Sequence, residues 1–395
     1  MSGIVIVGAG ECGVRAAFAL REHGYKGSVA LLSEEMHLPY ERPPLSKQCL
    51  PAHKPIRPKA DYQQAGIELC LRTRIEALDL AGHRLLGRDG SSRIYDKLLL
   101  ATGARARLFP GMEGAATLRT FDDACRIFER LRAGARLAII GGGFIGLELA
   151  AAARAMDVQV TVIEAASRLM ARGVPAEIAA IVEARHRAEG VDLRLGMQVA
   201  ALVAGGVEIA DGSTVAADIV VAGTGATPNT ELAEKAGLAV GNGIMVDSRF
   251  RTSAPDVFAA GDCCSMPYRG DWLRLESWRV AQEQGAHAAA AMLGAVGEWT
   301  TVPWFWSDQY DLGLQVAGWA AAEAKTTIRH LSDDAAVAFQ HDDEGRLICA
   351  AGVGRGNRVA KDIRLAEMLI LREARPPADQ LADPTFNLKS LLKAA

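Results

Sequence analysis

The chain lacks several features that would indicate particular classes of protein. No apolar run approaches the roughly 18 residues of a membrane-spanning helix, and a net charge of −3 gives no reason to expect nucleic-acid binding. The N-terminus shows no basic segment of a signal peptide. The seven cysteines are scattered, without a CxxC pair or zinc-type spacing. We therefore expect a cytoplasmic protein that binds neither nucleic acid nor a membrane, has no metal site and is no dithiol–disulfide enzyme.

A glycine-rich turn follows the first apolar run of the chain. The run at 4–7 leads into Gly8-Ala9-Gly10-Glu11-Cys12-Gly13, then into an alanine- and leucine-rich helix expected at 12–22. A second apolar strand is expected at 28–32 and is followed by the acid Glu34. This order of strand, glycine turn, helix, strand and acid is typical of a dinucleotide site. A later apolar run at 97–100 ends in Ala101-Thr102-Gly103.

The same order occurs a second time. The apolar run at 137–140 leads into Gly141-Gly142-Gly143-Phe144-Ile145-Gly146, a helix expected at 144–156 and a strand expected at 158–163. Glu164 follows that strand, and a later run at 218–221 ends in Ala222-Gly223-Thr224-Gly225. A duplication of this length is far less probable by chance than one short motif. It favours an enzyme that passes electrons between two dinucleotides.

Each of the three glycines in the pattern GxGxxG has a physical role. The first glycine permits a tight turn, the second lets the backbone approach the pyrophosphate, and the third lets helix and strand pack closely. The pyrophosphate then lies at a helix N-terminus, where free N–H groups favour anions. Glu164 would accept hydrogen bonds from both ribose hydroxyls, which favours NADH over NADPH. Arg168 and Arg172 lie close enough in sequence to leave NADPH open, and a solvated loop acid is the alternative for Glu164.

Other segments resemble the FAD-dependent ferredoxin reductases of oxygenase systems, over almost the whole chain and in the same order. The segments that carry the resemblance are Pro39-Tyr40-Glu41-Arg42-Pro43-Pro44-Leu45-Ser46-Lys47, 141–148, Ala260-Gly261-Asp262-Cys263, Leu275-Glu276-Ser277-Trp278, Trp304-Phe305-Trp306-Ser307-Asp308-Gln309 and Asn387-Leu388-Lys389. The resemblance implies an α/β fold with two Rossmann-like dinucleotide-binding domains of the glutathione-reductase type and a C-terminal α+β domain. It implies an FAD domain split between 1–109 and 240–298, an NAD domain at 110–239 and a C-terminal domain at 299–395.

The resemblance also implies which residues hold the two cofactors. The residues for FAD would be Gly8, Gly10, Cys12, Gly13, Glu34, Arg42, Lys47, Ile75, Ala101, Thr102, Gly103, Arg119, Gly261, Asp262, Ser277 and Trp278. The residues for NADH would be Gly141, Gly143, Phe144, Ile145, Gly146, Glu148, Glu164, Arg172 and Gly225.

Three residues would form the catalytic set: Lys47, Glu148 and Trp306. In the family, the lysine lies beside the reactive edge of the flavin and pairs with the glutamate after the second glycine turn. The ammonium would stabilise the anionic reduced flavin, and Glu148 would fix its position. Trp306 resembles an aromatic between the flavin and the ferredoxin side, with a hydrophobic plug between domains as the alternative.

The sequence departs from the thiol-dependent relatives at one position. The stretch 45–49 has Lys47 where a reactive thiol is expected, so Cys49 is expected to be inert. The adjacent Cys263 and Cys264 are expected to be structural, because adjacent cysteines form strained disulfides.

The implied activity is transfer of electrons from NADH through FAD to a [2Fe-2S] ferredoxin that feeds a Rieske oxygenase or a cytochrome P450. Two alternatives remain: an NADH oxidase or rubredoxin reductase, and a redox-sensing flavoprotein of the apoptosis-inducing-factor type. Ferredoxins are usually acidic, which favours a basic docking patch, although the same residues could be ordinary solvated charges. The candidates are Arg355, Arg358, Lys361, Arg364, Arg372 and Arg375.

Overall fold

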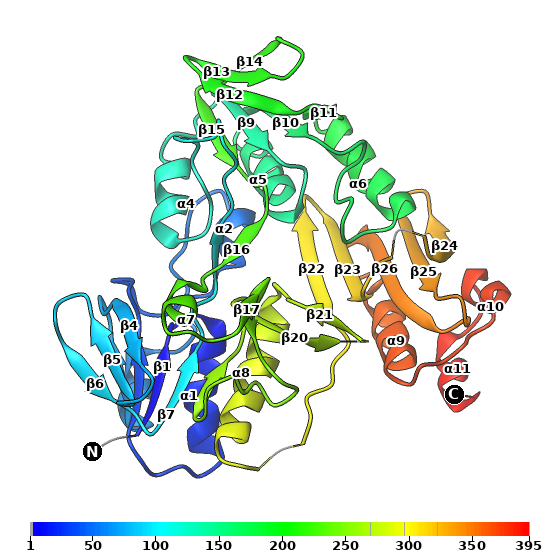
Figure 1. The fold of residues 1–395 in the computed structure, drawn as a ribbon. Helices are drawn as coiled ribbons and strands as arrows, with labels where there is room; N and C mark the ends of the chain where they lie inside the picture. Colours follow the sequence, from blue (N-terminus) through cyan, green and yellow to red (C-terminus); the bar gives the residue numbers. More distant parts are fainter. Residues whose placement is uncertain (1–2, 269, 296, 322, 395) are drawn as a thin grey trace. The chain divides into compact units, whose positions relative to one another are not determined.

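A computed structural model describes residues 3–268, 270–295, 297–321 and 323–394 (Figure 1). The chain divides into two compact units, each built from three separate segments. Unit 1 comprises 1–41, 53–105 and 226–300, and unit 2 comprises 42–52, 106–225 and 301–395.

Unit 1 is organised around a five-stranded parallel sheet in the order β19-β7-β1-β2-β3. Its strands are β1 (Ile4–Val7), β2 (Val29–Leu32), β3 (Ile67–Cys70), β7 (Lys97–Leu100) and β19 (Val257–Ala259). Three of them, β1, β2 and β19, are buried at every residue, as expected for parallel strands covered on both faces. Helices α1 (Glu11–Glu22) and α8 (Trp278–Met292) pack against each other.

Smaller elements complete unit 1. An antiparallel sheet contains β4 (Ile75–Asp79), β5 (Arg84–Gly87) and β6 (Ser92–Ile94). A second small sheet contains β17 (Val240–Gly241), β18 (Gly243–Met245), β20 (Cys264–Tyr268) and β21 (Asp271–Leu273). The short helices are α3 (Lys59–Gln64) and α7 (Glu231–Lys235). Strands β8 (Ala104–Ala106) and β16 (Ala226–Pro228) lie where the chain passes between the units.

Unit 2 contains the second parallel sheet, in the order β11-β10-β9-β15. These strands are β9 (Arg136–Ile140), β10 (Gln159–Glu164), β11 (Asp192–Leu195) and β15 (Ile219–Ala222). The helices are α2 (Pro44–Lys47), α4 (Phe121–Phe128), α5 (Phe144–Arg154) and α6 (Ala176–Ala188). A reciprocal capping box between Thr120 and Asp123 starts α4. A three-stranded antiparallel sheet adds β12 (Val199–Val203), β13 (Gly206–Ile209) and β14 (Thr214–Ala216).

The C-terminal part of unit 2 is an antiparallel five-stranded sheet in the order β22-β23-β26-β25-β24, with α9 packed against β23 and β26 (Figure 1). The strands are β22 (Trp304–Gln309), β23 (Leu312–Gly318), β24 (Lys325–Ser332), β25 (Ala335–His341) and β26 (Leu347–Arg355). The helices are α9 (Ala360–Leu371), α10 (Ala378–Ala382), the 3₁₀ helix η1 (Leu388–Ser390) and α11 (Leu391–Ala394).

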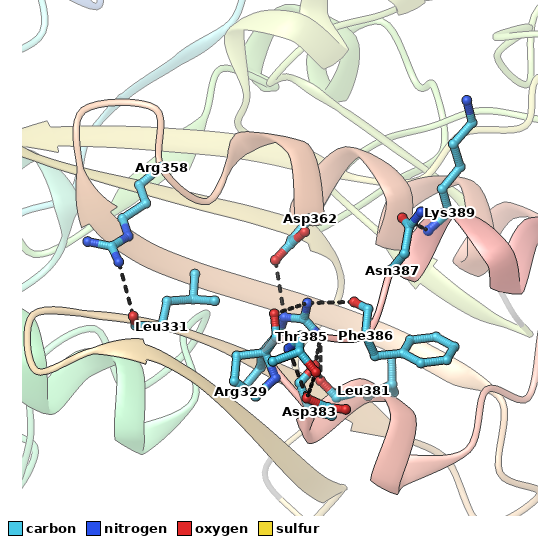
Figure 2. A network of polar contacts seen from close by, with 11 residues as sticks. Arg329, Leu331, Arg358, Asp362, Leu381, Asp383, Thr385, Phe386, Asn387 and Lys389 are labelled. Carbon is cyan, nitrogen blue, oxygen red and sulfur yellow. Dashed lines mark hydrogen bonds and ion pairs between the residues drawn. The ribbon is translucent and has the colours of Figure 1, made fainter.

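A buried arginine secures the end of the chain to this sheet. Arg329 on β24 is 4% exposed and lies 3.4 Å from Asp362 of α9. Its guanidinium also donates to the backbone carbonyls that follow α10, including Asp383, Pro384 and Phe386 (Figure 2). Because these carbonyls end a helix or lie beyond it, they have no intrahelical donor. One planar cation therefore satisfies several acceptors at once.

The architecture confirms the expected fold class, because it contains two Rossmann-like parallel sheets with their helices and a C-terminal α+β part. The helices and strands expected around both glycine turns begin and end within two residues of their predicted limits. The three-domain division itself stays a prediction.

Candidate functional site

The first glycine turn has the shape of a dinucleotide cradle. Gly8 has φ +108°, and a Cβ there would lie 2.1 Å from the carbonyl oxygen of Ala101. A Cβ on Gly13 would lie 1.9 Å from the carbonyl oxygen of Gly8, so the close approach of helix and strand requires glycine. Gly10 caps α1, and a Cβ on it would meet nothing within 4 Å. The space that a Cβ would fill is the space through which a pyrophosphate approaches the helix N-terminus.

Two further segments of unit 1 are joined at the end of β7. The hydroxyl of Thr102 donates to the backbone oxygen of Asn229 at 2.7 Å, and the Asn229 amide donates to the Thr102 oxygen at 2.8 Å. Gly103 has φ +67°, which favours glycine. This reciprocal pair fixes the turn 101–103 beside the first cradle.

The Gly-Asp turn after β19 lies against the first cradle as well. The N–H of Gly261 donates to the side-chain oxygen of Gln284 at 2.7 Å, and a Cβ on Gly261 would lie 3.0 Å from the Cβ of Cys12. Gln282 on α8 donates to Glu11 at 2.6 Å. Burial raises the pKa of Glu11, and hydrogen bonds from Gln282 and Trp278 partly offset the rise. Of the predicted FAD residues, the structure thus gathers Gly8, Gly10, Cys12, Gly13, Ala101, Thr102, Gly261, Asp262, Ser277 and Trp278 around one helix end.

Glu34 lies at a different part of the same unit. It lines a pocket of about 500 Å³ together with Arg72, Arg74, Arg88 and Asp89, and Arg74 lies 3.3 Å from its carboxylate. Ile75 opens strand β4 next to Arg74 and is half-buried. The pocket has room for a nucleoside portion and carries both an acceptor and several cations.

The second glycine turn repeats the first in unit 2. Gly141 has φ +107°, and a Cβ there would lie 2.5 Å from the oxygen of Gly223. A Cβ on Gly146 would lie 2.4 Å from the oxygen of Gly141, whereas one on Gly143 or Gly225 would meet nothing within 4 Å. Both cradles therefore fit a dinucleotide by the same test.

The remaining predicted NADH residues surround this turn differently. Glu164 accepts hydrogen bonds from the N–H groups of Gly142 and Ala166, both at 2.7 Å. Phe144 packs edge-on against Phe305, with ring centroids 5.0 Å apart. Ile145 and Arg172 are exposed. The guanidinium of Arg168 donates to the carbonyls of Leu169, Ala171 and Val174.

The predicted catalytic residues converge within unit 2. Lys47 ends α2, Glu148 lies in the second turn of α5, and their charged atoms are 3.4 Å apart. Lys47 also lies 2.6 Å from the Asp308 carboxylate and 5.0 Å from the centre of the Trp306 ring. Trp306 stacks on Trp304 and donates from its indole nitrogen to Asp308 at 3.1 Å. An ammonium bounded by two carboxylates and an aromatic face is held in a defined place.

The Glu148 carboxyl group is buried and accepts hydrogen bonds from two serines. It is 6% exposed, accepts a hydrogen bond from Ser307 at 2.6 Å and another from Ser46. Burial raises the pKa of Glu148, and Lys47, Ser307 and Ser46 act in the opposite direction. Sequence reasoning assigned no role to Ser46, Ser307 or Asp308, although all three fall inside segments that carry the resemblance.

Two other predicted flavin residues also meet in unit 2. Arg42 donates to the backbone oxygen of Arg119 at 2.7 Å, and the N–H of Arg119 donates to Asp123 at 3.1 Å. The two arginines are therefore neighbours, as a shared site requires.

The cysteine side chains are buried or half-buried. All seven cysteines fall within the described residues and are free thiols. Cys263 and Cys264 are fully buried, and burial raises the pKa of both. Cys49 donates to the backbone oxygen of Ala152 at 3.7 Å.

Several arginines of the predicted basic patch already have partners close by. Arg355 pairs with Asp334 at 2.8 Å and Arg364 with Glu367 at 2.7 Å. Arg358 donates to the backbone oxygen of Leu331 at 3.0 Å (Figure 2). Local pairing reduces the field that this surface presents to a partner.

Within the described residues there is no group of three or more His, Cys, Asp or Glu side chains placed to hold a metal ion. In the same residues no helix is both long and apolar enough to cross a membrane.

Comparisons with known proteins agree with this geometry. Residues 2–285 match the family model of pyridine nucleotide-disulphide oxidoreductases, and residues 304–392 match the reductase C-terminal domain. The ferredoxin–NAD(+) reductase component of the p-cumate 2,3-dioxygenase system of Pseudomonas putida is 39% identical, with 98% of each chain covered. The corresponding component of the anthranilate 1,2-dioxygenase system of Burkholderia cepacia is 41% identical, also with 98% of each chain covered.

Solved structures of ferredoxin reductases are also similar to this chain. Putidaredoxin reductase in its covalent complex with putidaredoxin has a TM-score of 0.94 and 34% identity, covering 100% of this chain and 99% of that one. The ferredoxin reductase for the CYP199A2 system of Rhodopseudomonas palustris has a TM-score of 0.93 and 36% identity, covering 99% of each chain. With its two dinucleotide cradles, the chain thus belongs to the pyridine nucleotide-disulphide oxidoreductase family, as an FAD- and NADH-dependent oxidoreductase of the ferredoxin–NAD(+) reductase type.

Proposed function

We propose that this protein carries electrons from NADH, through FAD, to a [2Fe-2S] ferredoxin that serves a Rieske oxygenase or a cytochrome P450. The observation that carries the proposal is the Lys47–Glu148 ion pair beside the second cradle. In the sequence, Lys47 stands where thiol-dependent relatives are expected to have a reactive cysteine. Names of relatives support the acceptor, since several are reductase components of dioxygenase systems. They favour a ferredoxin over an oxidase or a sensor role.

The first cradle would hold FAD and the second NADH. Gly8, Gly10 and Gly13 would admit the FAD pyrophosphate to the N-terminus of α1, with Glu34 at the adenosine ribose and Asp262 at the ribityl or pyrophosphate portion. Gly141, Gly143 and Gly146 would do the same for NADH at α5. Glu164, whose oxygens already order the turn, would present its carboxylate to the ribose.

Bound FAD supplies the conversion of a two-electron donor into one-electron steps. The protein's own contribution is to hold charge in place. The Lys47 ammonium, fixed by Glu148 and Asp308, would favour the anionic reduced flavin. Trp306 would lie between this site and the ferredoxin side. A general acid or base on the protein is not required.

The finer statements of organisation are also proposals. The FAD domain would comprise 1–109 and 240–298, the NAD domain 110–239 and the C-terminal domain 299–395. The protein would act in the cytoplasm, where its seven free thiols would be kept reduced.

Anaerobic stopped-flow reduction of the FAD-loaded protein tests the proposal. We expect rapid bleaching by NADH, much slower bleaching by NADPH, and reoxidation after a [2Fe-2S] ferredoxin is added. Bleaching that persists in the presence of ferredoxin would contradict the acceptor. Rapid reoxidation by rubredoxin or by oxygen instead would move the function to those acceptors.

The docking surface has a test of its own. Reversing the charge at Arg358 and Lys361 should raise the KM for ferredoxin and weaken its salt dependence, while reduction by NADH stays unchanged. Arg84, which forms an exposed ion pair with Asp79 in unit 1, provides the matched control. If the double variant behaves like Arg84→Glu, ferredoxin docks elsewhere.

A further inference from the structure

A line of buried hydrogen bonds runs from Glu148 to helix α6. Ser307 donates to Glu148 at 2.6 Å, and the side-chain nitrogen of Gln309 donates to the Ser307 hydroxyl at 3.0 Å. The Gln309 oxygen lies 2.8 Å from Nε2 of His186, and Nδ1 of His186 lies 3.1 Å from the Tyr310 hydroxyl. Ser307 and His186 are 0% exposed and Gln309 is 3% exposed. The line is therefore shielded from water along its middle.

With Glu148 ionised, the chemistry of the groups allows one direction for this line. A carboxylate only accepts, so Ser307 must point its single hydrogen at Glu148. The hydroxyl can then only accept from Gln309, which turns the amide NH₂ toward Ser307 and the amide oxygen toward His186. His186 must consequently carry its hydrogen on Nε2, and Tyr310 must donate to Nδ1. Every donor points toward Glu148.

The opposite direction is equally specific. If Glu148 were protonated and donated to Ser307, the Gln309 amide would have to flip, and His186 would have to carry its hydrogen on Nδ1. The tautomer of His186 therefore reports the direction of the line, and with it whether Oε1 of Glu148 accepts the hydrogen of Ser307.

The residue at the outer end of the line, Tyr310, has an unfavourable backbone conformation. Tyr310 occupies the turn between β22 and β23 with φ +56°, a left-handed conformation that a bulky residue rarely adopts. Its ring packs edge-on against His186 at 5.0 Å, and the Arg185 guanidinium lies 5.2 Å from its centre. Strain of this kind persists only where surrounding contacts impose it.

We propose that His186, Gln309 and Ser307 are positioning residues, which hold the Ser307 hydroxyl as a donor and so keep the Glu148 carboxylate charged beside Lys47. The proposal rests on the proposed function in one respect, namely that the Lys47–Glu148 pair acts on the flavin. The line itself is a property of the protein alone. Its members come from α5, α6 and β22, together with the turn that follows β22.

Other charged groups near the two ends are consistent with this direction. Lys47 lies near Glu148 from α2, and Asp308 from β22 lies beyond that lysine. Around His186, Arg185 comes from α6 and Glu189 caps the C-terminal end of that helix, while Asp311 pairs with Arg185 at 2.6 Å. Burial lowers the pKa of His186, which favours the neutral ring that the geometry requires.

The first experiment reads the tautomer directly. Nitrogen-15 correlation spectra of the FAD-loaded protein, recorded without NADH or ferredoxin, resolve the rings of its eight histidines. We expect His186 to be neutral and protonated on Nε2 throughout the neutral pH range. The signal that disappears in His186→Gln identifies it, and the signal displaced in Tyr310→Phe identifies it if that variant does not fold. A cationic ring, or a hydrogen on Nδ1, overturns the proposal.

The second experiment tests the consequence for Glu148. The rate of flavin reduction by NADH is measured against pH in Ser307→Ala, Gln309→Leu and Gln309→Glu. Loss of a donor favours the protonated carboxyl, so the acid limb of the profile should move upward by about one pH unit. Gln309→Glu should move it furthest, because its carboxylate would draw the Ser307 hydrogen away from Glu148.

The control is Gln340→Leu, which removes a buried glutamine with three hydrogen bonds from β25 of the same sheet. An equal displacement in this variant, or none in the three test variants, overturns the proposal. If NADH does not reduce the flavin of the unaltered protein either, the proposed function fails. The tautomer of His186 then still decides whether the line of hydrogen bonds exists.

Discussion

The two glycine turns have nearly the same backbone and different surroundings. Gly8 and Gly141 have φ +108° and +107°, and the capping glycines Gly10 and Gly143 have ψ −171° and −178°. The helices differ at the fifth residue after the cap. In α1 this residue is Arg15, which is partly exposed and forms an ion pair with Glu22 at 2.8 Å. In α5 it is the buried Glu148.

The reason lies in what covers each helix. Helix α1 packs on α8, where Gly285 approaches the backbone of Cys12 so closely that a Cβ would lie 2.3 Å from its oxygen. Helix α5 packs on α2 and β22, which bring hydroxyls and an ammonium to Glu148. A common cradle thus admits a dinucleotide in both units, and the neighbouring elements decide where a reactive charge can be held.

The largest expected effects come from the glycines that both turns share. Gly13→Ala should yield protein without bound FAD, because its Cβ meets a backbone oxygen at 1.9 Å. Gly146→Ala should keep FAD and raise the KM for NADH by roughly tenfold or more, since the corresponding distance is 2.4 Å. Flavin absorbance and steady-state kinetics measure the two effects.

Gly10→Ala and Gly143→Ala distinguish a loss of cofactor binding from misfolding. Their Cβ atoms meet no protein atom within 4 Å, so thermal unfolding of the apoprotein should change little while cofactor binding weakens. Loss of FAD from a variant at Gly143 or Gly146 would contradict the assignment of one cofactor to each turn.

The next largest effect concerns Glu148 and pH. Burial raises its folded-state pKa, so the folded protein binds this proton more tightly than the unfolded chain does. The contribution of Glu148 to stability therefore falls as pH rises from the ordinary carboxyl pKa through the raised one. In Glu148→Gln this loss is absent, so its melting temperature relative to the unaltered protein should increase across that window.

The flavin of the same variant should be reduced by NADH about tenfold or more slowly, because within the described residues Lys47 then keeps one carboxylate partner, Asp308. Melting curves followed by circular dichroism and stopped-flow reduction provide the two readouts. A stability difference that is independent of pH would mean that the carboxyl titrates normally.

A smaller effect separates the acids that follow the second strands. Glu164 accepts two backbone hydrogen bonds at 2.7 Å, whereas the exposed Glu34 lies 3.3 Å from the guanidinium of Arg74. Glu164→Ala should destabilise the protein by about 2 kcal/mol or more and weaken NADH binding. Glu34→Ala should cost less than about 1 kcal/mol in stability. Chemical denaturation checks the order, and equal losses would remove the distinction between the two acids.

The smallest effect is expected at Arg15. Because exposed ion pairs contribute little, Arg15→Ala should change the free energy of unfolding by less than about 1 kcal/mol. Reduction by NADH should keep its rate. A slower reduction would show that the fifth position of α1 also acts on the cofactors.

Sequence reasoning reached the two cradles because all their determinants are local. A strand, a glycine turn and a helix occupy fewer than about twenty residues, and each glycine answers a steric demand of that short segment. The resemblance to a family added Lys47, Glu148 and Trp306, which the structure brings together. Their supporting residues were not identified. Ser46 and Ser307 lie 102 and 159 positions from Glu148 in the chain, and serines at such separations carry no recognisable pattern.

By itself the sequence determined the duplicated strand–turn–helix order and the positions where glycine is required, because backbone sterics act between neighbours in the chain. Only the tertiary structure decided that one helix would expose Arg15 and the other would bury Glu148. It also decided that a histidine on α6 would complete the line of donors to that carboxylate. Burial and hydrogen-bond direction depend on residues far apart in sequence, and they arise only when the chain is folded.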